Sequence, residues 1–281
     1  MKYLITGASG MLGRDLQAVL AGRDVTALGR SDLDVTDLHA VTAAIAGHDV
    51  IINAAAYTKV DDAETHEDEA YAVNAVGPRN LAVAASALKA TLVQISTDYV
   101  FDGSATTPYA ENTPRSPISA YGRTKAAGEE FVQVENVSHS YIVRTAWLYG
   151  KNGPNFAKTM LRLAGSQPTV NVVNDQVGQP TWTVDLAAQI VLLLDSDAPA
   201  GVYHGTNAGV ASRCDFARAI FQRAGFEPNR VLPIDGAPYV RPARRPSYSV
   251  LGHDAWSVAG IAPMRDWRQA LDAASAAGAV Q

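Results

Sequence analysis

A glycine-rich segment near the N-terminus constrains the fold of this chain more than any other feature of the sequence. It occupies residues 6–13, TGASGMLG, directly after an apolar run at residues 3–5 and directly before a segment with helical periodicity. Glycines between a strand and a helix are typical of a dinucleotide-binding βαβ unit. Gly7 permits a tight turn, Gly10 lets a pyrophosphate approach the backbone, and Gly13 allows close packing of helix on strand. The alternative interpretation is a plain turn whose glycines serve only helix packing.

The start of the helix that follows this turn is suited to an anion. Its first N–H groups have no partner within the helix, and the helix dipole favours negative charge at this end. We therefore expect the phosphates of a dinucleotide to bind here. The residues of this segment expected to contact the cofactor are Gly7, Ser9, Gly10, Met11 and Leu12.

Apolar runs alternate with amphipathic segments through the first half of the chain. Expected strands lie at residues 3–5, 24–28, 50–52, 92–95 and 141–143, and expected helices at 11–20, 36–46 with Thr36 as N-cap, 67–88 and 121–133. Strands that alternate with helices indicate parallel βαβ units, and continuous apolar strands indicate a sheet covered on both faces. The pattern predicts an α/β fold with a Rossmann-type, doubly wound parallel sheet.

The pattern loosens after residue 150, where prolines become frequent. A helix at 186–194 and a strand at 201–204 still predict a return to the sheet. We expect a smaller, discontinuous C-terminal lobe that binds the substrate beside the cofactor domain. The predicted division assigns residues 1–146 and 183–210 to the NAD(P)-binding Rossmann domain, and residues 147–182 and 211–281 to the substrate-binding lobe.

The composition disfavours several classes of protein. A net charge of −5 argues against a nucleic-acid partner, and no apolar run reaches the roughly 18 residues of a membrane span. Cys214 is the only cysteine, which excludes an internal disulfide and suits a reducing compartment. We expect a soluble cytoplasmic protein with no nucleic-acid or membrane partner.

The G-x-x-G-x-x-G spacing resembles that of the extended short-chain dehydrogenase/reductase superfamily, which uses nicotinamide cofactors. The second expected strand ends at Leu28-Gly29-Arg30, with no acid to bind the ribose and one arginine to pair with a 2′-phosphate. This favours NADPH, with NADH as the alternative and an ordinary surface role as the alternative for Arg30. By the superfamily pattern, Asp34 and Val35 flank the adenine. The small residues Ala54, Ala55 and Ala56 leave room for the phosphates and ribose.

Tyr121 and Lys125 lie four residues apart, on one face of an expected helix. Reduction of a ketone requires a proton at the oxygen, and a nearby ammonium is expected to lower the tyrosine pKa from its usual ~10. Thr97 follows the fourth strand, and active sites of open α/β sheets lie at the carboxyl ends of strands. We therefore expect Thr97 to hydrogen-bond the substrate carbonyl. The alternative is that Ser96 and Thr97 merely cap a loop.

Nearly the whole chain resembles the dTDP-4-dehydrorhamnose reductases. The most specific matches are the Thr-Asp-Tyr-Val-Phe run from Thr97 and the Asp-Gln-x-Gly-x-Pro-Thr run from Asp175. The resemblance implies reduction at C4 of dTDP-4-dehydro-L-rhamnose, giving dTDP-L-rhamnose for cell-surface polysaccharide, with Thr97, Tyr121 and Lys125 as catalytic residues. It implies a sugar pocket lined by Thr58, Val60, Tyr99 and Trp147, for which packing is the alternative role. From the arginine cluster at 241–245 we expect Arg241 to face the diphosphate.

Some members of this family are described with Mg²⁺ held by acidic residues between two subunits. Asp15 and Asp185 are acidic at plausible places, but no dense carboxylate cluster accompanies them, and the histidines lack metal-ligand spacing. We expect no obligatory metal and a monomer or homodimer.

Four alternative functions stay open. A 4,6-dehydratase carries Thr-Asp-Glu where this chain has Thr97-Asp98-Tyr99, so the second carboxylate that elimination needs is missing. A nucleotide-sugar 4-epimerase and a talose-forming reductase are excluded less firmly. A non-catalytic regulatory subunit, like the β-subunit of methionine adenosyltransferase, is disfavoured by the intact Thr97, Tyr121 and Lys125.

Overall fold

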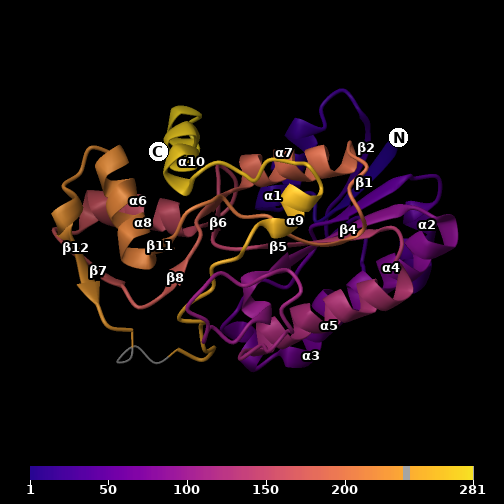
Figure 1. Ribbon diagram of the computed structural model, residues 1–281, viewed down its shortest axis with the longest axis horizontal. Coiled ribbons are helices and arrows are strands. Elements are labelled where there is room, and N and C mark those ends of the chain that lie inside the picture. Colours follow the sequence, from indigo (N-terminus) through magenta and orange to yellow (C-terminus); the bar gives the residue numbers. More distant parts are fainter. Residues whose placement is uncertain (237–240, 281) are drawn as a thin grey trace.

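A six-stranded parallel sheet forms the centre of the computed structural model, which describes residues 1–236 and 241–280 (Figure 1). The strand order is β10-β5-β4-β3-β1-β2, and each neighbouring pair is parallel. The order reverses between β1 and β3, which opens the crevice where open α/β sheets bind ligands. The strands are β1 (Lys2–Thr6), β2 (Asp24–Leu28), β3 (Val50–Asn53), β4 (Thr91–Thr97), β5 (Ser140–Thr145) and β10 (Gly201–His204).

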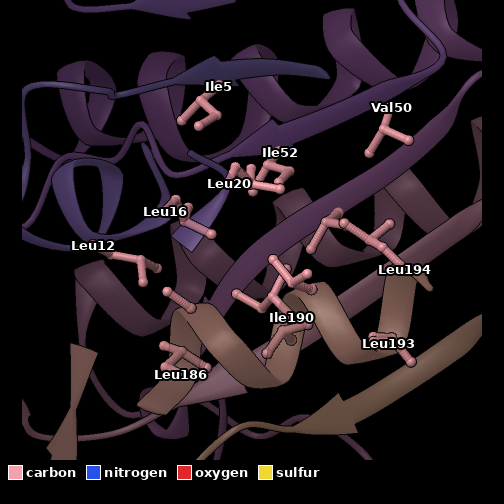
Figure 2. Close-up of a cluster of buried hydrophobic side chains, with 14 of the residues drawn as sticks. Ile5, Leu12, Leu16, Leu20, Val50, Ile52, Leu186, Ile190, Leu193 and Leu194 are labelled. Atoms are coloured by element: carbon pink, nitrogen blue, oxygen red, sulfur yellow. The ribbon is translucent and has the colours of Figure 1, made fainter. Parts of the chain in front are cut away.

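Helices cover both faces of this sheet, as expected from its continuous apolar strands (Figure 1). α1 (Met11–Val19) packs beside α7 (Thr183–Leu194) on one face, and Ile5 and Ile52 point into that layer (Figure 2). The neighbouring residues Leu4 and Ile51 point into the opposite layer. That second layer consists of α2 (Leu38–Ile45), α4 (Gly77–Leu88) and α5 (Ala120–Glu135). The predicted doubly wound α/β fold is confirmed.

One local expectation was wrong. Thr36 does not cap α2: the carboxylate of Asp37 accepts hydrogen bonds from the backbone N–H groups of His39 and Ala40, one residue later than expected. Thr36 bonds instead to Asp34. The expected helical stretch at 67–88 is confirmed, and within it a π-helical turn, η2 (Ala72–Val76), joins α3 (Glu67–Tyr71) to α4.

A second hydrophobic cluster lies beside the sheet and is built from late segments of the chain. It contains Tyr149 and Trp182 together with Phe216 and Trp267. Trp256 and Met264, by contrast, pack with the first layer of the sheet. The predicted domain boundaries stay a prediction, and residues 237–240 and 281 of the predicted lobe lie outside the described residues.

The late segments contain short paired strands and helices (Figure 1). β7 (Val170–Val173) pairs with β12 (Val231–Ile234), β6 (Leu148–Tyr149) with β9 (Thr181–Trp182), and β8 (Val177–Gly178) with β11 (Ala211–Ser212). The helices are α6 (Phe156–Ser166), α8 (Arg213–Arg223), α9 (Asp254–Val258) and α10 (Trp267–Ala276), with 3₁₀ turns η1 (Asp62–Glu64), η3 (Asp98–Val100) and η4 (Pro228–Arg230). Across residues 1–236 and 241–280, no helix is both long and apolar enough to span a membrane.

Candidate active site

The glycine turn lies at the switch point of the sheet, between β1 and α1. Gly7 has a φ of +65° and approaches β3 so closely that a Cβ would lie 2.6 Å from the backbone of Ala54. At Gly13 a Cβ would lie 2.3 Å from the Gly7 carbonyl oxygen, which itself accepts a hydrogen bond from Gly10 N at 2.9 Å. Side chains at these positions would therefore push the turn away from the sheet or from α1.

The N-terminus of α1 is open to a ligand. Gly10 is its N-cap and offers no side chain, and the first turn carries no acidic residue. Ser9 and Gly10 are exposed, Met11 is half-buried, and Leu12 is buried in the layer beneath. The turn thus leaves helix N–H groups and the positive end of the helix dipole accessible to an anion.

The remaining expected cofactor residues follow β2 and β3. Arg30 is exposed directly after β2, and its positive charge adds to hydrogen bonds from Thr36 in lowering the pKa of Asp34. Val35 is buried against Gly77 at the start of α4. The three alanines 54–56 are half-buried after β3, beside the glycine turn.

Thr97 and Tyr121 meet at the carboxyl end of β4. The strand extends two residues further than expected, so Thr97 is its last residue rather than part of a loop. The Thr97 hydroxyl hydrogen-bonds with Asp98 Oδ1 at 3.0 Å and accepts from Tyr99 N at 3.2 Å, and it also forms a hydrogen bond with the Tyr121 phenol. The rings of Tyr99 and Tyr121 meet edge to face, with centroids 5.6 Å apart.

The start of α5 explains why Tyr121 lies beside this strand end. Ser119 caps the helix by accepting a hydrogen bond from Gly122 N. Gly122 is so close to η3 that a Cβ would lie 2.3 Å from the carbonyl oxygen of Tyr99. The first turn of α5 therefore rests on the Tyr99 backbone, which brings the phenol of Tyr121 to Thr97.

The electrostatic state of Tyr121 differs from expectation. Burial raises its pKa well above the usual value; the hydrogen bond with Thr97 opposes this rise, and Asp98 and Tyr99 add to it. The expectation that Lys125 lowers this pKa was wrong: burial dominates, and Lys125 is not among the groups that shift the pKa of Tyr121. The Lys125 ammonium donates instead to the Ile95 carbonyl at 2.6 Å. A protonated phenol at neutral pH is the form that a proton donor needs.

Lys125 is itself perturbed. Burial lowers its pKa to about 8, while the charge of Glu129, one turn further along α5, opposes that change. Its ammonium therefore titrates within the range in which enzymes are commonly assayed, unlike an exposed lysine near ~10.4.

The residues expected in the sugar pocket fall into two groups. The first group consists of Tyr99 and Trp147, which both interact with Arg213. The Arg213 guanidinium lies 3.6 Å from the centroid of the Trp147 ring and acts electrostatically on Tyr99. Trp147 has a φ of +47°, a conformation rare for a residue with a side chain. Thr58 is exposed and Val60 half-buried on the loop after β3.

Two arginines of the expected cluster contact Asp61 and differ in exposure. Arg241 is 64% exposed, with its guanidinium 3.6 Å from Asp61. Arg245 is 19% exposed and holds both carboxylate oxygens of Asp61 at 2.9 Å. Arg245 also acts electrostatically on Tyr99, so it lies on the side of the cluster that faces the site.

Three residues near the site were missed by sequence reasoning. Asp98 is buried beside Thr97, and burial raises its pKa while Ser249 and Arg213 oppose that rise. Arg213 and Arg245 come from segments more than 100 residues along the chain from Tyr99. Asp98 could have been found from its place next to Thr97, and Arg245 from the arginine cluster at 241–245, whereas no local pattern marks Arg213.

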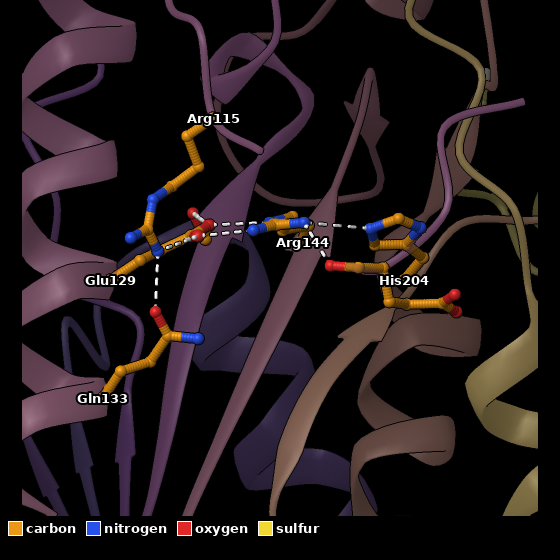
Figure 3. Close-up of polar contacts among 7 residues, drawn as sticks. Arg115, Glu129, Gln133, Arg144 and His204 are labelled. Atoms are coloured by element: carbon orange, nitrogen blue, oxygen red, sulfur yellow. Dashed lines mark hydrogen bonds and ion pairs between the residues drawn. The ribbon is translucent and has the colours of Figure 1, made fainter. Parts of the chain in front are cut away.

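A buried ion pair lies behind the strand end (Figure 3). Arg144 of β5 donates to Glu129 from Nε at 2.9 Å and from Nη2 at 2.7 Å, and Arg115 approaches the same carboxylate at 3.3 Å. The hydroxyl of Ser96 also donates to Glu129, at 2.5 Å. The network fixes α5 against β4 and β5 directly beneath Thr97.

Among the described residues, no group of three or more His, Cys, Asp or Glu side chains could hold a metal ion.

The sequence and the fold are similar to those of known proteins. The family model described as RmlD substrate binding domain matches residues 1–279. The chain is 50% identical to a dTDP-4-dehydrorhamnose reductase of Streptomyces griseus (96% of this chain, 91% of the relative) and 50% identical to a dTDP-4-keto-6-deoxy-D-glucose reductase of Streptomyces niveus (96% and 95%). A crystal structure of dTDP-4-dehydrorhamnose reductase from Bacillus anthracis in complex with NADP superposes with a TM-score of 0.94 at 41% identity (98% of this chain, 99% of that one).

Fold and site define a Rossmann-fold oxidoreductase of the extended short-chain dehydrogenase/reductase type. Within this class, the chain belongs to the dTDP-4-dehydrorhamnose reductase family, which confirms the resemblance seen in the sequence.

Proposed function

We propose that this protein reduces the C4 ketone of dTDP-4-dehydro-L-rhamnose with NADPH, giving dTDP-L-rhamnose for cell-surface polysaccharide. The observation that carries the proposal is the Tyr121 phenol, kept protonated by burial and hydrogen-bonded to Thr97 at the carboxyl end of β4. Relatives at 50% identity over nearly the whole chain support the substrate class.

The proposed chemistry divides the two transferred groups between cofactor and protein. Bound NADPH supplies the hydride. Tyr121 donates the proton to the ketone oxygen, and Thr97 hydrogen-bonds that oxygen so that the carbonyl faces the phenol. Lys125, one turn along α5, hydrogen-bonds the ribose next to the nicotinamide.

The glycine turn supports the choice of cofactor, because its bare N-cap and accessible helix N–H groups suit a pyrophosphate. We propose that Arg30 pairs with the 2′-phosphate and so favours NADPH over NADH. The full proposed cofactor set is Gly7, Ser9, Gly10, Met11, Leu12, Arg30, Asp34, Val35, Ala54, Ala55, Ala56, Tyr121 and Lys125.

The proposed sugar pocket is the space between Thr97 and the late segments of the chain. Tyr99 and Trp147 supply aromatic surface, and Arg213 is the charged group stacked against it. Thr58 and Val60 approach from the loop after β3, and Arg241 serves the diphosphate. We further propose the two-domain division given above, and action in the cytoplasm as a monomer or homodimer without an obligatory metal.

The test is a stoichiometric assay on the purified protein. With dTDP-4-dehydrorhamnose and NADPH, the absorbance of reduced nicotinamide should fall by one equivalent per sugar, because the hydride leaves the cofactor for good. An epimerase would return the cofactor and give no net loss. The same assay with dTDP-4-keto-6-deoxy-D-glucose, the substrate named for one relative, should give slower turnover; faster turnover there would overturn the choice of sugar.

A further inference from the structure

Buried polar side chains form a hydrogen-bonded chain across three neighbouring strands beneath the glycine turn. Thr6 of β1 donates to Asn53 Oδ1 at 2.6 Å, and Asn53 of β3 donates to Gln94 Oε1 at 2.7 Å. Gln94 of β4 then donates to the Ile95 carbonyl at 2.7 Å. Thr6, Asn53 and Gln94 are direct cross-strand partners, so the chain follows the register of the sheet.

This hydrogen-bonded series is unusual because the rest of the same face of the sheet is apolar. Leu4, Ile51 and Leu92, two residues earlier on the same strands, belong to the hydrophobic layer under α4 and α5. Gln94 is only 2% exposed and Asn53 is fully buried. Buried amides cost free energy unless every polar atom finds a partner, and leucine or valine would pack here without that cost. Two amides kept in such a layer therefore need an explanation beyond packing.

The chain ends on the carbonyl that holds Lys125. Lys125 Nζ donates to the Ile95 oxygen at 2.6 Å, and Gln94 Nε2 donates to the same oxygen. A carbonyl oxygen has two lone pairs, so these two donors saturate it. Every donor in the chain points from β1 towards this oxygen, and the first member, Thr6, immediately precedes Gly7 of the turn.

We propose that Gln94 is a positioning residue for Lys125, with Asn53 holding the Gln94 amide in place. By sharing the Ile95 carbonyl with the ammonium, Gln94 determines how firmly and at which point Lys125 is held. The same series of hydrogen bonds links the Ile95 carbonyl to Thr6 at the end of β1, where the glycine turn begins. This inference rests on the proposed function, in which Lys125 serves catalysis.

The charges around Lys125 make its titration a usable readout. On α5, Glu129 favours the ammonium and burial opposes it, which places the Lys125 pKa at about 8. Tyr121, also on α5, has its pKa raised far above this range. From β4 the nearest groups are the neutral Gln94 amide and Ile95 carbonyl, while Asp98 beyond the strand end acts on Tyr121. Turnover that needs the ammonium should therefore fall as the pH rises through about 8.

The test replaces Gln94 by leucine and by glutamate. In Gln94→Leu the ammonium becomes the only side-chain donor to Ile95, so the alkaline limb of kcat should move upward by about 0.5–1 pH unit, and kcat should fall roughly tenfold. The KM for NADPH should stay within about threefold, because the glycine turn is untouched. Gln94→Glu should move the limb further upward, since it places a carboxylate near the ammonium, and it keeps the side-chain volume if the leucine variant fails to fold.

Gln189→Leu is the matched control. Gln189 of α7 is equally buried and donates to the Ala262 carbonyl at 2.9 Å, on the opposite face of the sheet from Lys125. The Gln189→Leu variant should be less stable than the wild type, but the alkaline limb of its kcat–pH profile should be unchanged. A Gln94→Leu limb and kcat equal to wild type, or an equal shift in Gln189→Leu, would overturn the proposal.

A second readout does not depend on activity. In protein labelled with ¹⁵N-lysine, the Lys125 Nζ resonance, assigned with Lys125→Arg, should titrate near pH 8 and move upward in Gln94→Leu. If the sugar is not reduced but this shift is seen, the proposed function fails and the positioning role stands. If turnover is normal and the shift is missing, the positioning role fails alone.

Discussion

Replacement of Glu129 by glutamine should destabilise the protein strongly, because it breaks a buried ion pair. The carboxylate is fully buried, and its main partner Arg144 is only 2% exposed. Glutamine supplies one acceptor where the guanidinium needs two, and it turns an N–H₂ group towards a cation. Removal of one partner from a buried pair costs about 3–5 kcal/mol, because the other charge is left without compensation. At the lower figure, roughly 3 kcal/mol, the melting temperature of a chain this size should fall by about 6–12 °C.

The pH dependence gives this prediction a second signature. Burial acts to raise the pKa of Glu129, but hydrogen bonds and charge from Arg144, with Ser96 and Arg115, outweigh it and lower the pKa below 4.5. A carboxylate with a depressed pKa in the folded state stabilises the protein fully above its unfolded pKa, and this stabilisation is lost as the pH falls through the folded value. The gap between wild type and Glu129→Gln should therefore be widest at neutral pH and should begin to narrow as the pH falls below about 4.5, the unfolded pKa.

Urea unfolding followed by circular dichroism at pH 7.5 and pH 4 measures both effects. Glu135→Gln is the control on the same helix: its partner Arg79 is 53% exposed at 3.4 Å, and exposed pairs contribute less than about 1 kcal/mol. The double variant Glu129→Gln with Arg144→Met should recover part of the loss, since the buried Arg144 charge is removed and the remaining Arg115 is 24% exposed. A Glu129→Gln loss as small as that of Glu135→Gln would refute the reasoning.

Three further variants test the proposed site. Tyr121→Phe should lower kcat by about 10²- to 10⁴-fold although NADPH still binds, since the ring is kept and the proton donor is lost; an active enzyme in stopped-flow assays would remove Tyr121 from the mechanism. Arg30→Ala should weaken NADPH by about tenfold or more, the size of one hydrogen bond to a charged group, and leave NADH nearly unaffected; equal loss for both cofactors in fluorescence titrations would show that Arg30 does not contact the 2′-phosphate. Gly10→Val should abolish cofactor binding by calorimetry, because even a Cβ at Gly10 lies 3.1 Å from the Gly7 carbonyl and the branched side chain covers the α1 N-terminus. Unchanged affinity there would exclude this turn as the phosphate site.

The sheet and the glycine turn could be predicted because their signals are local. Apolar runs bounded by turn residues located the strands to within two residues, and strand β2 was placed without error. The error at the start of α2 came from neighbouring residues with similar chemistry. Thr36 and Asp37 are both good N-caps, and only the backbone conformation at Asp37 decides between them.

The electrostatics of the site could not be predicted in the same way. The pKa of Tyr121 depends on burial and on Asp98 and Tyr99 at the end of β4. The Lys125 ammonium donates to the Ile95 carbonyl, a contact that the spacing of residues in the sequence does not predict. Arg213 reaches Trp147 from a distant segment of the chain. Spacing shows which side chains share a helix face, whereas the charge state of a buried group depends on everything packed around it.

The central claim is that hydride passes from NADPH to C4 of the sugar while Tyr121 supplies the proton. The most direct measurement supplies dTDP-4-dehydrorhamnose with NADPH deuterated at C4 of the nicotinamide and follows the product by NMR. The account predicts dTDP-L-rhamnose with deuterium on C4. Deuterium at another carbon, a product of different configuration at C4, or sugar recovered without deuterium would contradict it.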